Sequence, residues 1–542
     1  MGLRSGRSLP PDAVALPPPE WFKSGIYLGM AAAGRFLTDG MPVRRGDWWR
    51  DAILGGQRSV RGVDVTEATA LIIGGPGLAH KSAGWQAGVI AQWGGRGPVL
   101  VLSTKPDQAR WTGPLRERVG NVMVLDWPGK QAASLPYQRV KWDPLDGCED
   151  AGVAKDRMAS MMETALMGGA KGDKFWEKNA VAVVSAYAHG ARVKGAGVEQ
   201  VMSWLDRDEL AEVQRVLKAH GSRARLGTRL ATLGGKAEET REGVLHMARL
   251  VFEACEDPAV LEGCTPDLID PTFDIDKFLD SSDTLYILDK GGKSTVSVLA
   301  PLTVALVNAI WEKAEAKADA TLAGPGCLAG RLERPLLLVL DEAASISPLP
   351  NLVNVLSQAR GRGLAICVAL QSWSQLSERW GVAGAGAIMD TVAYRLIGAG
   401  LQDMDFLTDI SKSLGEKQVW RPSVGSQSGG SGSGASRKGK SESHTLVETP
   451  NWKGSSLSSL PAGGAMLLGP EGARPVQLPA LPALLEAMER AEEVSAPVGT
   501  GARGTPETAS GPDYQPDAGG WPPPPRWWSR LRRGAGTREE TP

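Results

Sequence analysis

Cysteine and histidine are scarce in this chain and follow no pattern. There are five of each among 542 residues, and the odd set of cysteines includes no CxxC pair. A disulfide framework needs paired cysteines at regular spacing, and a zinc site needs clustered cysteine and histidine ligands. The sequence therefore indicates neither kind of site and predicts a protein of the reducing cytoplasm.

An excess of charge of one sign is also lacking. Lys and Arg number 60 against 61 Asp and Glu, which gives a formal net charge of -1. Proteins that wrap polyanions by bulk charge are strongly basic. Any contact of this chain with nucleic acid must therefore be local.

Long apolar runs are few. The best candidate for a membrane span, STVSVLAPLTVALVNAIW at 294–311, is uncharged but contains Ser, Thr, Asn and Pro and continues directly into EKAEAKADA. A membrane helix needs about 20 mostly apolar residues, so we expect a buried helix here. The start, MGLRSGRSLPPDAVALPPPEWF, has prolines where a signal peptide has an apolar stretch. We therefore predict no transmembrane helix and no signal peptide.

Short apolar runs alternate with turns and helix-like stretches in two separated parts of the chain. ATALIIGG, PVLVLS and NVMVLDW come first, and DTLYILD, PLLLVLD and LAICVAL follow after residue 280. Continuous Val, Ile and Leu runs are typical of buried strands in a parallel sheet. Between the two parts, apolar residues recur at helical spacing, with Gly at several helix ends. The sequence therefore predicts an α/β fold with a mostly parallel sheet, interrupted by an all-helical domain.

Composition divides the chain further. Its 67 Gly and 37 Pro are more than an average chain of this length has, and the excess lies largely in the termini and around GSQSGGSGSGASRKGKSES, a composition typical of linkers and disordered tails. We expect an irregular Pro/Gly/Trp-rich arm at 1–60, the α/β domain at 61–147 and 266–420, the helical domain at 148–265, a Gly/Ser-rich linker or loop at 421–447, a C-terminal part of the α/β domain at 448–490, and a disordered tail at 491–542.

A glycine-rich turn, LIIGGPGLAHKSAG, follows the first strand and precedes a helix. Gly75, Gly77, Lys81 and Ser82 fit a phosphate-binding loop, in which backbone N–H groups and the lysine bind phosphates and the serine hydroxyl binds Mg²⁺. His80 replaces the glycine before the lysine, where the backbone must approach the phosphate closely. The loop predicts nucleotide binding, and an ordinary strand-to-helix turn is the alternative.

An acidic pair, Asp341 and Glu342, ends the apolar strand in PLLLVLDEAASISP. A carboxylate at such a strand end can hold Mg²⁺, and the next one can polarise the attacking water. The alternative is a helix N-terminus, where acidic residues are favourable against the helix dipole. The pair follows a run of buried aliphatic residues, which favours the magnesium interpretation.

Further polar residues follow in SQARGRGLAICVALQS. Gln371 ends a buried strand and can read the terminal phosphate, whereas Arg360 and Arg362 are expected to follow a helix. An arginine offered to a neighbouring subunit's phosphate makes hydrolysis depend on assembly. The alternatives are a solvated turn for Arg360 and a strand end satisfied by the backbone for Gln371.

The segment 336–381, LLLVLDEAASISPLPNLVNVLSQARGRGLAICVALQSWSQLSERWG, closely resembles the core of type IV coupling proteins of the TraG/TraD kind. Looser similarity extends over about 66–480 and includes LVLSTKPDQ, WDPLDGCED, FWEKNA and LPAGGAMLLGPEGARPVQL. The resemblance implies a RecA-like P-loop NTPase domain of the wider FtsK/HerA group, interrupted by a helical domain and assembled as a homo-hexamer. It implies an ATPase, dependent on ATP and Mg²⁺, that hands relaxase-bound single-stranded DNA to a type IV secretion channel in conjugation.

By position, the resemblance assigns the nucleotide to Gly75, Gly77, Lys81 and Ser82, Mg²⁺ to Ser82 and Asp341, water activation to Glu342, the sensor to Gln371, and the arginine acting in a neighbouring subunit to Arg360. Two departures are His80 and the absence of the N-terminal transmembrane helices that many members carry. They favour an alternative, a nucleotide-binding but poorly hydrolysing adaptor that recruits secretion substrates. A chromosome-partitioning or phage-type DNA pump is a weaker alternative. In each case we expect a cytoplasmic protein, recruited in conjugation to the inner face of the cytoplasmic membrane.

Overall fold

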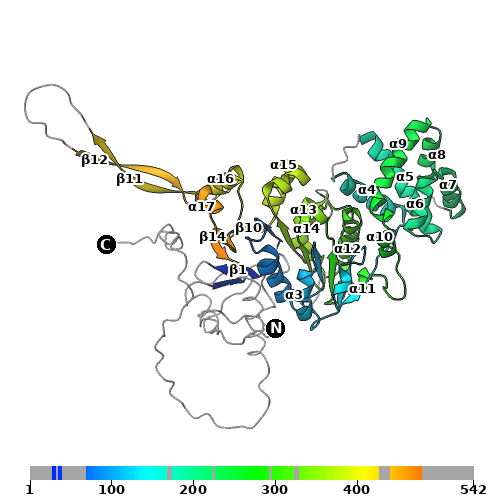
Figure 1. The fold of residues 1–542 in the computed structure, drawn as a ribbon, viewed down its shortest axis with the longest axis horizontal. Coiled ribbons are helices and arrows are strands. Elements are labelled where there is room, and N and C mark those ends of the chain that lie inside the picture. The colour runs from blue at the N-terminus through cyan, green and yellow to red at the C-terminus, as the bar shows by residue number, and fades with distance from the viewer. Residues whose placement is uncertain are drawn as a thin grey trace, which may run out of the picture.

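The computed structural model describes residues 27–31, 35–38, 69–167, 174–221, 226–291, 296–322, 329–426, 440–470 and 472–478. The predicted tail at 491–542 and most of the predicted arm at 1–60 lie outside the described residues. Figure 1 shows an α/β body with the helical domain at one end and a two-stranded hairpin at the other.

A sheet of twelve strands forms the centre of the α/β body, in the order β2-β1-β14-β13-β10-β3-β9-β8-β4-β7-β5-β6. Its parallel part comprises β3 (Thr69–Ile73), β4 (Val99–Ser103), β5 (Val122–Leu125), β6 (Gln138–Arg139), β7 (Thr284–Leu288), β8 (Leu336–Leu340), β9 (Leu364–Leu370) and β10 (Tyr394–Gly398). Every residue of β3, β4, β7, β8 and β9 is buried. Apolar runs without alternation suit strands covered on both faces, and the predicted α/β class with a mostly parallel sheet is confirmed.

The two faces of the sheet belong to separate hydrophobic cores. Because successive side chains of a strand point to opposite faces, Leu71 and Ile73 of β3 enter one core while Ala70 and Ile72 enter the other. The first core also takes in residues of α11 (Ile275–Leu279), α12 (Ala300–Ala320), α14 (Leu352–Arg362) and α15 (Trp373–Thr391). The second core takes in residues of α2 (Ala87–Trp93), α3 (Asp107–Arg116) and the 3₁₀ turn η4 (Ala132–Ser134).

One edge of the sheet is antiparallel. It is built by β13 (Gly464–Gly469), β14 (Gly472–Gln477), β1 (Tyr27–Ala31) and β2 (Arg35–Thr38). The prediction of an irregular arm at 1–60 is therefore wrong for β1 and β2. The edge strand of a sheet has unpaired N–H and C=O groups that any extended segment can bind. The pairing of β1 with β14 therefore does not depend on a periodic pattern of apolar residues, which the sequence of the arm lacks.

Helices occupy residues 151–263, between β6 and α11. They are α4 (Ala151–Met167), α5 (Lys174–Val193), α6 (Val198–Asp206), α7 (Leu210–Ala219), α8 (Leu226–Gly234), α9 (Glu238–Arg249), the 3₁₀ helix η5 (Leu250–Glu256) and α10 (Pro258–Gly263). α5 contacts α4, α6, α7, α8 and α9, and its residues 183–191 are all buried. A helix that is buried all round lies at the centre of its bundle, so α5 is the core helix of this domain.

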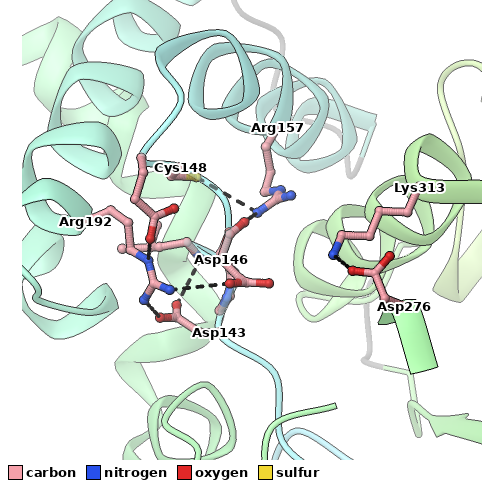
Figure 2. Close-up of polar contacts among 10 residues, drawn as sticks. Asp143, Asp146, Cys148, Arg157, Arg192, Asp276 and Lys313 are labelled. Carbon is pink, nitrogen blue, oxygen red and sulfur yellow. Dashed lines mark hydrogen bonds and ion pairs between the residues drawn. The ribbon is translucent and has the colours of Figure 1, made fainter. Parts of the chain in front are cut away.

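Two arginines hold the segment that leads from the sheet into the helical domain (Figure 2). Arg192 of α5 binds Glu149 at 2.6 Å, Asp143 at 3.1 Å and Asp146 at 3.3 Å. Arg157 of α4 donates to the backbone carbonyl of Asp146. The segment is therefore fastened from both α4 and α5, and the helical domain joins the body through a charged clamp.

The uncharged run at 294–311 is largely contained in α12, and residues 300–307 are all buried. α12 packs against α4 of the helical domain. Within the described ranges, no helix combines the length and hydrophobicity that crossing a membrane requires.

A long hairpin leaves the body between α16 (Met404–Ser413) and α17 (Gly454–Ser458). Its strands, β11 (Glu416–Ser426) and β12 (Lys440–Pro450), pair antiparallel along their whole length and form a separate sheet. The prediction of a linker or loop at 421–447 is therefore wrong at both ends of that range, while 427–439 lies outside the described residues. The Gly/Ser-rich centre dominates the composition of the segment, but ladder hydrogen bonds come from the backbone and form beside it.

Candidate nucleotide-binding site

A cavity of about 570 Å³ opens where β3, β4, β7, β8 and β9 end. Ligands of α/β proteins bind at the carboxyl ends of parallel strands, because the loops there converge on one edge of the sheet. The predicted site residues that line the cavity are Gly75, Gly77, Lys81, Ser82, Asp341, Glu342 and Gln371. Arg360 does not line it.

Close backbone approach explains the glycine at position 75. A Cβ there would lie 2.7 Å from the Gly400 carbonyl oxygen, and the Gly75 N–H donates to the Ala399 carbonyl at 2.8 Å. Gly77 has a φ of +72°, in the left-handed region that glycine adopts without steric cost. The loop thus passes tightly against the turn after β10 and then bends along the cavity.

His80 adopts the backbone conformation that glycine would otherwise supply. Its φ of 49° and ψ of 34° are left-handed, which costs a non-glycine residue roughly 1–2 kcal/mol, although histidine is among the residues enriched there. Its Nδ1 lies 3.4 Å from the Leu478 carbonyl oxygen, and its own carbonyl accepts the N–H groups of Gly84 and Trp85. The histidine therefore preserves the path of the loop into the π-helical turn η3 (Lys81–Gln86).

Lys81 is buried at the cavity wall. Its Nζ donates to the carbonyl oxygens of Gly74 at 2.6 Å and Gly75 at 3.5 Å. Burial lowers the pKa of Lys81, while the carboxylates of Glu342 and Asp341 raise it. The ammonium group is thus held by acceptors that phosphate oxygens can replace.

Ser82 and Asp341 face each other across the cavity floor. The Ser82 hydroxyl donates to the Asp341 carboxylate and lies 3.0 Å from each of its oxygens, and the Ser103 hydroxyl donates to Oδ2 at 3.4 Å. Burial raises the pKa of Asp341 to about 6, with Glu342 as the second cause. Hydroxyl and carboxylate oxygens are the donors that Mg²⁺ prefers, and a bound cation would favour the ionised carboxylate that burial disfavours. The donor set therefore fits a magnesium ion.

Glu342 and Gln371 form a hydrogen-bonded pair on the same wall. Nε2 of Gln371 donates to Oε1 of Glu342 at 2.5 Å. Glu342 directly precedes the short helix α13 (Ala343–Ile346) and has a φ of 56°, a left-handed conformation that persists only where the surroundings enforce it. The carboxylate is thus held in a fixed direction, where it can accept a proton from a water molecule in the cavity.

Arg360 lies far from the cavity. It is exposed in the last turn of α14, which leads into the first residue of β9. Gln371 lies at the opposite end of β9, directly after its last residue. β9 has seven residues, or about 23 Å at roughly 3.3 Å per residue. Arg360 therefore cannot reach the cavity of its own chain.

Sequence reasoning gave no role to several residues that line the cavity. They are Ser103, Thr104, Lys105, Asp107, Gln108, Trp111, Lys290, Ser297 and Ser345. Nε2 of Gln108 donates to the Ser82 carbonyl at 3.1 Å and so supports the phosphate loop from the neighbouring helix. These residues could have been found from their position in polar stretches close behind the apolar strands, which is how Asp341 was predicted.

Part of this chain matches a known family. Residues 335–461 match a family model described as the TraM recognition site of TraD and TraG. This range contains the acidic pair, Arg360, Gln371 and the hairpin. A comparison with curated proteins finds no match.

Solved structures of one coupling protein share the fold. The unbound bacterial conjugative coupling protein TrwBdeltaN70 matches with a TM-score of 0.54 and 19% identity, covering 76% of this chain and 84% of that chain. The plasmid coupling protein TrwB in complex with ADP and Mg²⁺ matches with a TM-score of 0.52 and 18% identity, covering 78% and 89%. Its complex with the GTP analogue GDPNP matches with a TM-score of 0.53 and 17% identity, covering 84% of this chain and 95% of that chain. The RecA-like P-loop fold and the predicted resemblance to coupling proteins of the TraG/TraD kind are thus confirmed, by the family model over residues 335–461 and by a fold shared across most of the chain.

Proposed function

We propose that this chain is an ATP-dependent coupling protein that recruits relaxase-bound single-stranded DNA and translocates it to a type IV secretion channel. The observation that carries the proposal is the convergence of Lys81, Ser82, Asp341, Glu342 and Gln371 on one cavity. These residues come from three segments that are far apart in the sequence. The crystallised complex of TrwB with ADP and Mg²⁺ supports the choice of ligand.

Each residue has a separate part in the proposed reaction. Backbone N–H groups at Gly75 and Gly77 and the Lys81 ammonium hold the phosphates, and Ser82 and Asp341 hold Mg²⁺. When bound, the ion neutralises charge on the phosphate oxygens. Glu342 takes a proton from the attacking water. Gln371 holds the Glu342 carboxylate in the direction that this transfer needs.

Assembly enters the proposal through Arg360. Because it lies at the opposite end of β9 from the cavity, it can serve only the cavity of a neighbouring subunit. A homo-hexameric ring at the inner face of the cytoplasmic membrane places one such arginine beside each site. The net charge of -1 means that DNA is held by local groups of the ring and not by bulk attraction.

The test is steady-state ATP hydrolysis by the purified chain, with and without single-stranded and double-stranded DNA. Lys81→Ala and Glu342→Gln remove the phosphate ligand and the base. Lys412→Ala on α16 is a matched control, because this exposed side chain pairs with the exposed Asp409. We expect DNA-stimulated turnover in the wild type and the control and none in the two site variants. Absence of turnover in every condition would overturn the proposal.

The alternative function is a nucleotide-binding adaptor that hydrolyses poorly and recruits secretion substrates. His80 favours it, because a side chain lines the cavity at a position where the phosphate loop frame has glycine. The adaptor is supported if magnesium-ATP binds, Lys81→Ala removes the binding, and turnover is absent. If the wild-type chain does not bind magnesium-ATP either, both functions are excluded and only the assignment of the fold stands.

A further inference from the structure

A buried arginine joins the catalytic segment to the helical domain. Arg379 lies on α15, and its side chain is 8% exposed. Its Nε donates to the carbonyl oxygen of Ala344 at 3.1 Å, and its Nη1 donates to the carbonyl oxygen of Met167 at 3.0 Å. Ala344 belongs to α13, the helix that begins directly after Glu342. Met167 is the last residue of α4. One guanidinium group therefore contacts both units.

The two carbonyl groups carry this contact. The nearest carboxylate, that of Glu378, is 61% exposed and lies 3.8 Å from Nη1, so it gives little compensation for burying the charge. A buried guanidinium is stable only when its donors are satisfied, and its rigid planar fork suits acceptors from two different elements. The last carbonyls of a helix have no partner within the helix and lie at the negative end of its dipole. Met167 is thus a favourable and directional acceptor.

The first part of α15 is also tied to the sensor. The Gln371 N–H donates to Oε1 of Gln375 at 3.0 Å, and the Ser372 hydroxyl caps the helix by accepting the Gln375 N–H at 3.2 Å. Gln375 and Arg379 are four residues apart and share one face of the helix. The backbone of Gln371 is therefore connected to the helical turn that carries Arg379.

A break in α15 separates this part from the rest of the helix. Gly381 has a φ of 71° and a ψ of 164°, which are not helical. The segment 373–380 is thus a short rigid unit that ends at a glycine able to adopt other dihedrals. The residue before this glycine is anchored as well, because Nε1 of Trp380 donates to the Leu349 carbonyl at 2.8 Å.

We propose that Arg379 is a positioning residue that transmits the state of the Glu342–Gln371 pair to the helical domain through residues 373–380. The proposal rests on the proposed nucleotide site. When a nucleotide rearranges Gln371, the unit 373–380 follows it and the bond from Arg379 to Met167 changes, so the last turn of α4 responds. Since coupling between two sites is reciprocal, a ligand that holds α4 in place also biases the pair.

The test is hydrogen–deuterium exchange of the full chain, with and without the magnesium complex of a non-hydrolysable ATP analogue. We expect the analogue to change exchange in the last turns of α4 in the wild type. Arg379→Gln is expected to abolish that change while the Kd for the analogue stays within about threefold. Arg362→Gln is the matched control, since it removes ion pairs to Glu315 and Asp319 within the α/β body and should leave the α4 response intact.

The outcomes separate this proposal from the proposed function. If calorimetry finds no binding of the analogue to the wild type, both are overturned. If the analogue binds and α4 does not respond, or responds equally in Arg379→Gln, only the coupling is overturned. If Arg379→Gln does not fold, Arg379→Lys decides, because it keeps the charge but lacks the fork; an α4 response equal to the wild type would overturn the coupling.

Discussion

Nε2 of Gln371 and Oε1 of Glu342 are 2.5 Å apart although α13, α14 and β9 lie between the two residues in the sequence. They meet because β8 and β9 are parallel neighbours, with Leu340 opposite Val368. The residues that follow the two strands consequently emerge at the same edge of the sheet. The contact joins the residue assigned to water activation with the residue assigned to sensing.

Gln371→Ala tests this contact. Without the amide, the Glu342 carboxylate loses its fixed direction, and we expect turnover to fall by roughly 100-fold, the lower range of what a positioned base contributes. Nucleotide affinity should remain near that of the wild type, because Gln371 does not hold the phosphates. Steady-state kinetics and calorimetry measure the two quantities. An equal loss of affinity and turnover would show that Gln371 acts through binding instead.

His80 gives a prediction about backbone strain. His80→Gly relieves a left-handed conformation but adds chain entropy to the unfolded state, so the free energy of unfolding should change by no more than about 1 kcal/mol. His80→Val places a β-branched residue in the same conformation and should cost about 2 kcal/mol more than glycine. Urea denaturation of both variants measures the difference. Equal stability of the two would mean that the loop does not enforce this conformation.

Arg360 is tested by mixing subunits. Arg360→Ala and Lys81→Ala rings should each lack turnover, since each lacks one half of every composite site. In mixed rings, an intact loop from the first variant meets an intact arginine from the second, so a fraction of the activity should return. ATP hydrolysis at several mixing ratios measures it. No recovery at any ratio would exclude action between subunits.

The pH dependence of stability follows from Asp341. Its pKa is raised from 3.8 to about 6, by burial first and by Glu342 second. Between these values the folded chain keeps a proton that the unfolded chain has lost, so the free energy of unfolding falls as pH rises through this window. The shift corresponds to at most about 3 kcal/mol. Urea denaturation without Mg²⁺ should show the fall, and Asp341→Asn should remove the part of it that Asp341 contributes.

Asp289 provides the matched control for the role of Asp341 in holding Mg²⁺. Burial likewise raises its pKa to about 6, but its carboxylate accepts a hydrogen bond from the Ser297 hydroxyl at 2.8 Å, whereas the Ser82 hydroxyl donates to Asp341. Asp289→Asn should therefore keep the stabilisation that Mg²⁺ and nucleotide give together, and Asp341→Asn should lose it. Retained stabilisation in Asp341→Asn would remove this residue from the magnesium site.

Two ion-pair sites drawn in Figure 2, the clamp around Arg192 and the pair of Lys313 with Asp276, should contribute unequally to the free energy of unfolding. Arg192→Ala leaves Asp143, whose side chain is 14% exposed, beside Asp146 without its cation, and we expect a loss of roughly 1–3 kcal/mol. Lys313→Ala removes a single pair with Asp276 whose side chains are 42% and 55% exposed, which should cost less than about 1 kcal/mol. Urea denaturation compares them. Similar losses would mean that the clamp acts as ordinary surface charge.

Strand-end reasoning found most of the site because parallel strands direct their carboxyl ends to one edge. Asp341, Glu342 and Gln371 each follow a run of buried aliphatic residues, a local and readable signal. Arg379 carries no such signal, because its partners are backbone carbonyls of Ala344 and Met167, which no pattern of side chains marks. The strands β1, β2, β11 and β12 were missed for a related reason, since backbone pairing also forms where composition is rich in Gly, Ser and Pro.

The hairpin has a consequence for how this chain can vary. Glu416 and Pro450 are paired at its base, and the residues just outside them are joined by a hydrogen bond from the Asn451 N–H to the Gly415 carbonyl at 2.9 Å. The chain thus leaves the body and returns to it at practically the same point. We therefore expect that lengthening, shortening or exchanging the segment between these two residues leaves the ends of α16 and α17 where they are, so that the hairpin can be replaced without disturbing the α/β body.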